Sequence, residues 1–115
     1  MARVVAFVPD LLFGSNVQGA LRAGGHEVEL VGNLDRPPAC DVVVVDLTDD
    51  GPARATAAGA LRLAGTLGDA KLLGFFAHVE PEVRAAALAA GFDLVVPRSR
   101  MNREGAALVD GLAAG

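Results

Sequence analysis

The chain has 115 residues and a formal net charge of −4, and only 4% of its residues are aromatic, with no Trp or Tyr. These values argue against a nucleic-acid-binding surface, which needs positive charge for the phosphates or aromatic rings for stacking. The single cysteine excludes an intrachain disulfide, and no apolar stretch approaches the roughly 20 residues that span a membrane. We therefore expect one cytoplasmic domain over residues 1–115, with no nucleic-acid or membrane partner.

The first third of the chain reads as strand, helix and strand. Residues 4–8 form a continuous apolar run, which is typical of a strand covered on both faces. Apolar residues between Phe13 and Leu21 then recur with helical spacing, and Gly24 ends that helix. Residues 26–31 alternate between polar and apolar side chains, which favours a strand at the edge of the sheet.

The next segment departs from a regular alternation of strands and helices. Residues 32–40 contain Pro37 and Pro38 and show no helical period, whereas residues 41–46 are a strand rich in valine. A link of about nine residues is shorter than the dozen or so that a parallel crossover usually needs. Nine extended residues still span roughly 30 Å. We therefore expect the second helix of the fold to be missing and replaced by an exposed, extended loop.

The rest of the chain alternates regularly. The elements that we expect are a helix over residues 50–67, a strand over 71–77, a helix over 80–90, a strand over 93–96 and a last helix that Asn102 caps and that ends near residue 113. Five strands and four helices in this alternation predict an α/β fold with a doubly wound parallel sheet. The flavodoxin-like strand order 2-1-3-4-5 is the common solution for five strands.

Polar side chains follow several of these strands. In doubly wound sheets, ligands bind at the carboxyl ends of the strands. The candidate binding residues at these ends are Asp10, Thr48, His78, Arg98 and Ser99, with Asp46, Asp49 and Arg100 beside them. Each also has a structural interpretation. Asp10 is a suitable N-cap for the first helix, Asp46 can terminate its strand by accepting from nearby amides, and His78 can be an ordinary loop histidine.

The order of these residues along the chain resembles the response-regulator receiver family, over all of the chain except the second helix. Receivers end their first strand with an acidic pair, of which Asp10 remains here, and Asp46 stands at their phosphoacceptor position after strand 3. Phe76 stands where receivers have Thr or Ser, and Val96 stands where they have Lys. Arg98 is the nearest cation to that position.

The resemblance implies a signalling function, and the departures from it imply a degenerate phosphoacceptor site. A Mg²⁺ ion at Asp10 and Asp46 would have few oxygen ligands, so we expect no required cofactor. We therefore predict a stand-alone, non-enzymatic module that acts by protein–protein binding. Two alternatives stay open: a small-ligand-binding protein or enzyme that uses the strand ends, and a functional phospho-receiver.

We also predict a homodimer. The missing helix leaves part of one sheet face near the first three strands without a cover, and exposed apolar patches often mark interfaces. The last helix carries Leu108, Val109 and Leu112 among small residues, and receivers by resemblance pair through this helix. The alternative is that these three side chains simply pack on the sheet.

Overall fold

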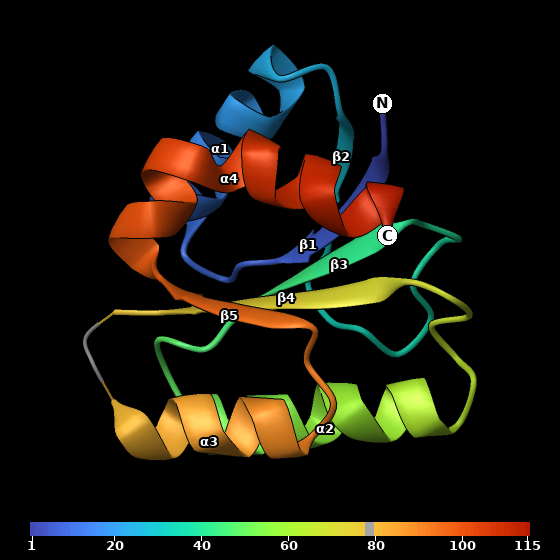
Figure 1. Cartoon of the computed structure of the whole chain (residues 1–115), viewed down its shortest axis with the longest axis vertical. Helices are drawn as coiled ribbons and strands as arrows, with labels where there is room; N and C mark the ends of the chain where they lie inside the picture. Colours follow the sequence, from blue (N-terminus) through green and yellow to red (C-terminus); the bar gives the residue numbers. More distant parts are fainter. Residues whose placement is uncertain (78–79) are drawn as a thin grey trace.

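Five parallel strands form one sheet in the order β2-β1-β3-β4-β5 (Figure 1). This computed structural model describes residues 1–77 and 80–115. The strands are β1 (Arg3–Phe7), β2 (Glu27–Leu30), β3 (Val42–Asp46), β4 (Lys71–Phe76) and β5 (Leu94–Pro97), and the helices are α1 (Leu11–Ala23), α2 (Gly51–Leu63), α3 (Pro81–Ala89) and α4 (Arg98–Ala114). The α/β class, the parallel sheet and the strand order are those expected from the sequence. In the described part of the chain, no helix is both long and apolar enough to cross a membrane.

The helices cover the sheet in two layers, with α1 and α4 on one face and α2 and α3 on the other (Figure 1). The position of β3 in the middle of the sheet explains its run of valines. Val42 and Val44 belong to the core cluster under α1 and α4, whereas Val43 and Val45 belong to the cluster under α2 and α3. Because successive side chains of a strand point to opposite faces, a strand covered on both sides is apolar at every position.

The connection between β2 and β3 contains no helix, as the sequence predicts. Residues 31–41 have neither helix nor strand and follow the teal trace in Figure 1. The segment is not fully exposed, however, because Leu34 and Cys40 pack against the core cluster under α2 and α3. Burial, and then the neighbouring charge of Asp41, raises the pKa of the Cys40 thiol. These two side chains therefore partly replace the cover that a helix would give.

Two helix boundaries differ from the sequence prediction. Helix α4 begins at Arg98, with Pro97 as its N-cap, and Asn102 lies one turn further on. The chain enters this helix directly from β5 because Pro97 is extended (φ −64°, ψ 150°) and Met101 is buried in the core under α1 and α4. Helix α2 ends at Leu63 rather than at residue 67, since Gly65 and Gly68 have positive φ and turn the chain back towards β4.

Candidate functional site

Strands β1 and β3 are neighbours in the sheet, and each is followed by an aspartate at the carboxyl edge. The pairing of Phe7 with Val45 sets Asp10 and Asp46 at that edge. Asp10 is the N-cap of α1, and its Oδ1 accepts a hydrogen bond from the Phe13 amide at 2.9 Å. The structural interpretation of Asp10 is thus confirmed, and one of its carboxylate oxygens is already in use.

Asp46 is buried, with 3% of its surface exposed. Its Oδ1 accepts from the Thr48 amide at 2.8 Å and from the Thr48 hydroxyl at 2.5 Å. The sequence therefore placed Thr48 correctly beside Asp46. Their contact fixes the turn that leads from β3 towards α2. It matches the expectation that Asp46 terminates its strand by accepting from nearby amides.

Arg54 is a site residue that sequence reasoning missed. It lies in the first turns of α2, and its Nη1 donates to the backbone carbonyl of Asp46 at 3.0 Å. Its guanidinium also lies over the Phe7 ring, 5.3 Å from the ring centroid. The available signal was its position eight residues after the end of β3, since the helix that follows a strand begins at the same edge of the sheet.

Arg98, in the first turn of α4, contacts the β1 side of this edge. Its guanidinium carbon is 3.7 Å from the centroid of the Phe13 ring, and its Nη2 is 4.0 Å from Asp10 Oδ2. The short distance to the ring is that of a cation–π contact. The cation nearest to the lysine position of receivers is therefore held by Phe13 and Asp10.

The remaining candidates lie at the periphery or outside the described part. Ser99 is exposed in the first turn of α4, where its carbonyl accepts from Arg103 Nε at 3.4 Å. Arg100 forms an ion pair with Glu104 at 3.3 Å. Asp49 is exposed. His78 lies outside the described residues.

Two apolar residues occupy the positions where the resemblance leads one to expect a hydroxyl and a lysine. Phe76, at the end of β4, is buried under α2 and α3, and Val96 of β5 is buried under α1 and α4. Both side chains are part of the core. Neither can donate a hydrogen bond to an anion at the carboxyl edge.

The described residues at this edge offer few ligands for a Mg²⁺ ion. Within residues 1–77 and 80–115, no group of three or more His, Cys, Asp or Glu side chains is placed to hold a metal. Mg²⁺ requires near-octahedral oxygen coordination. Asp10 and Asp46 each commit one oxygen to a backbone amide, so the two carboxylates offer few free ligands.

Two large apolar side chains are exposed next to Asp10. Leu11 and Leu12, in the first turn of α1, expose 86% and 75% of their surface. Neither is required by the core, which α1 reaches through Phe13, Val17 and Leu21. The carboxyl edge therefore carries an apolar surface beside its charged residues.

No protein-family model and no curated protein sequence matches the chain. Several solved structures do match its fold. A response regulator from Thermotoga maritima aligns with a TM-score of 0.83 at 18% identity, over 98% of this chain and 98% of that one. The signal receiver domain of NarL from Mycobacterium tuberculosis aligns with a TM-score of 0.74 at 25% identity, over 99% and 97% of the two chains. A response regulator receiver protein from Burkholderia phymatum gives 0.76 at 22%, over 99% and 96%. The chain thus has the fold of receiver domains over nearly its whole length.

Proposed function

We propose that the chain is a regulatory module that acts by binding a protein partner, and that its aspartate site does not hold a phosphoryl group. The observation that supports this proposal most directly is the burial of Phe76 and Val96, which stand where the resemblance to receivers leads one to expect a hydroxyl and a lysine. Asp46 itself is 3% exposed, and its Oδ1 accepts two hydrogen bonds from Thr48. The receiver fold supports a function in signalling.

The surroundings of Asp46 support the same conclusion. A bound phosphoryl group needs cations and hydrogen-bond donors around its oxygens. Phe76 and Val96 supply neither, and Arg98 is held by Phe13 and Asp10. Each missing charge-assisted contact costs roughly 1.5–3 kcal/mol. An acyl phosphate at Asp46 would therefore be poorly stabilised.

Protein binding is supported by the exposed leucines of α1. Leu11 and Leu12 are adjacent, large and apolar, and they flank the charged pair of Asp10 and Arg98. Clustered exposed apolar side chains with a polar rim are typical of protein interaction surfaces. A partner that covers this edge would remove both leucines from water.

The phosphoryl part of the proposal is tested by intact mass. The protein is incubated with a small acyl phosphate and Mg²⁺, with Asp46→Asn as the matched control. We expect no phosphoryl gain in either protein. A phosphoryl adduct in most wild-type molecules that is absent from Asp46→Asn would show that the site is functional, and the proposal would be wrong.

We also propose that the chain forms a homodimer through α4. Val109 is fully buried in the core. Leu108 and Leu112 pack against the same cluster but are only partly buried, so part of each side chain lies at the surface of α4. Sedimentation at micromolar concentration is expected to show a dimer that Leu108→Asp weakens. Leu88→Asp, on the exposed face of α3, is the control and should leave the dimer intact. A wild-type monomer throughout this range contradicts the dimer.

A further inference from the structure

A hollow of about 320 Å³ lies between α2 and residues 33–35, over β1 and β3. We name it the α2 groove. Its apolar lining consists of Phe7, Leu34, Val45, Ala53, Ala57, Ala58 and Leu61. No other part of the proposed function uses it.

The groove exists because the β2–β3 connection lacks a helix. Helices α2 and α3 pack mainly on β3, β4 and β5. Over β1, the described residues on this face are Leu34 of the β2–β3 connection and the side of α2 that carries Arg54. A parallel sheet is normally covered by helices on both faces. The side of α2 that faces β1 therefore has a short loop beside it in place of a neighbouring helix.

The α2 wall of the groove has the spacing of residues on which a second helix packs. The residues of α2 that line it recur three or four positions apart from Asp50 through Ala57 to Leu61, so they form one stripe along the helix. This stripe is roughly 16 Å long, which is about three helical turns. Three of its side chains are alanines, and small residues allow a second helix to approach at interaxial distances of about 8–10 Å.

The charge of the groove indicates the chemistry of its occupant. Asp35 lies on the loop wall and Asp50 on the α2 wall, and both are exposed. Neither forms an ion pair with any residue that the structure describes. The one cation of the lining, Arg54, is bound to the Asp46 carbonyl and lies over Phe7. Arg54 keeps its positive charge, so the lining carries two carboxylates and one guanidinium and is negative overall. The two carboxylates lie on opposite walls without an ion-pair partner among the described residues, whereas the guanidinium is held over Phe7.

We propose that the α2 groove is the docking site for an amphipathic helix of a partner protein. The apolar stripe of that helix packs on α2 and on the groove floor, and its flanking Lys or Arg side chains meet Asp35 and Asp50. This inference rests on the proposed function, in which the chain acts by binding a protein.

The test uses a synthetic amphipathic helical peptide with a leucine stripe flanked by lysines. A second peptide with the same stripe and glutamates in place of the lysines is the charge control. We expect the lysine peptide to bind more tightly, with backbone amide NMR shifts confined to α2 and residues 33–35. Raising the salt concentration should weaken its binding, because the partner charges are exposed.

Two variants on the same helix test the position of binding. Ala57 lines the groove and Ala60 does not, and both are exposed. Ala57→Trp fills the groove and should weaken peptide binding by about tenfold or more. Ala60→Trp should leave it unchanged. Combined Asp35→Asn and Asp50→Asn should weaken binding severalfold, and Asn suits the left-handed backbone at position 50 (φ 50°).

Several results would overturn the inference. One is the absence of binding at roughly 1 mM lysine peptide. Another is equal loss of binding in the two tryptophan variants, and a third is tighter binding of the glutamate peptide. If the protein without peptide self-associates and Ala57→Trp alone abolishes this, the occupant is a second copy and the partner helix is wrong. Phosphorylation of Asp46 would instead contradict the proposed function. It would not change the result of the peptide-binding experiment, so the two proposals can fail separately.

Discussion

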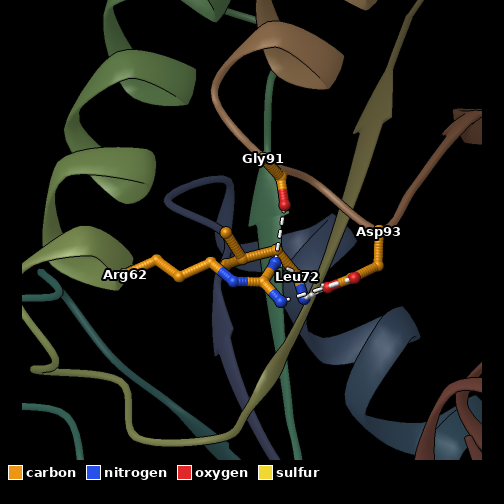
Figure 2. Close-up of polar contacts among 4 residues, drawn as sticks. All are labelled: Arg62, Leu72, Gly91 and Asp93. Atoms are coloured by element: carbon orange, nitrogen blue, oxygen red, sulfur yellow. Dashed lines mark hydrogen bonds and ion pairs between the residues drawn. The ribbon is translucent and has the colours of Figure 1, made fainter.

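Arg62 and Asp93 form an ion pair that fastens the last turn of α2 to the start of β5 (Figure 2). Arg62 Nη1 lies 2.7 Å from Asp93 Oδ2 and also donates to the Gly91 carbonyl at 2.6 Å. Asp93 Oδ2 accepts from the Leu72 amide at 2.8 Å as well. One carboxylate therefore joins α2, β4 and the turn before β5, at the amino end of the sheet and away from Asp46.

Replacing Arg62 with methionine should destabilise the fold. The substitution keeps much of the apolar stem but removes the donors to Gly91 and Asp93. We expect a loss of roughly 1–2 kcal/mol, since both side chains of the pair are partly exposed. Urea unfolding measures it. Arg84→Met, at an exposed position of α3, is the control, and an equal loss in both variants would contradict a specific role for the pair.

The same pair predicts how stability depends on pH. Burial by itself raises the pKa of Asp93, but the hydrogen bonds from Arg62 and Leu72 and the charges of Arg62 and Lys71 outweigh it, so the pKa is lowered. A group with a lowered folded-state pKa stabilises the fold above its unfolded pKa, which is about 3.9 for aspartate. That contribution is lost as the pH falls through the folded-state pKa. The difference in the free energy of unfolding between wild type and Asp93→Asn should therefore become smaller below about pH 4.

The control for the pH prediction is the Arg62→Met background. Arg62 contributes the leading hydrogen bond that lowers the pKa of Asp93. In that background, Asp93→Asn should alter the pH dependence much less. Urea midpoints of the four proteins, measured in steps down to acid pH, give the comparison. A difference that stays constant with pH in the wild-type background would rule out the expected linkage.

Two glycines in helices should respond oppositely to alanine. A Cβ at Gly59 of α2 would lie 2.5 Å from the Ala90 carbonyl oxygen and 2.8 Å from the Ala90 Cβ, whereas a Cβ at Gly19 of α1 meets nothing within 4 Å. Gly59→Ala should destabilise by about 1–3 kcal/mol because α2 and α3 must separate. Gly19→Ala should stabilise by roughly 0.5–1 kcal/mol through helix propensity. Thermal or urea unfolding distinguishes the two, and a stabilising Gly59→Ala would contradict the close approach.

Hydrogen exchange should map the segment that replaces the missing helix. Among residues 32–40, only the Asp35 amide has a hydrogen bond, to Asn33 Oδ1 at 3.0 Å. The flanking amides of Val31 and Asp41 donate to the Ala6 and Arg3 carbonyls. We expect fast exchange within the segment and slower exchange at its two ends. Slow exchange across residues 32–36 would indicate a structure other than the one described.

The fold could be predicted from local sequence patterns, because each pattern reflects a strong physical constraint on the backbone or on burial. The valine run of β3 marks a strand buried on both faces, and the alternation of such runs with helical patterns fixes a parallel sheet. Pro37 and Pro38 excluded a helix after β2. The predicted start of α4 was wrong because Asn102 is a residue type that favours the N-cap position. The helix instead begins at Arg98, where burial of Met101 holds the first turn against the core.

The sequence by itself indicated that Asp10, Asp46 and Arg98 lie at the carboxyl edge, because strand order and strand ends follow from hydrophobic periodicity. Their chemical state was decided by tertiary contacts that periodicity does not contain. Asp46 is buried against Thr48, Arg98 is drawn to the Phe13 ring, and Arg54 enters from the next helix. The α2 groove has the same origin. The sequence indicates that a helix is missing, but only the packing of Leu34 and α2 over β1 decides how much of the exposed face is left open.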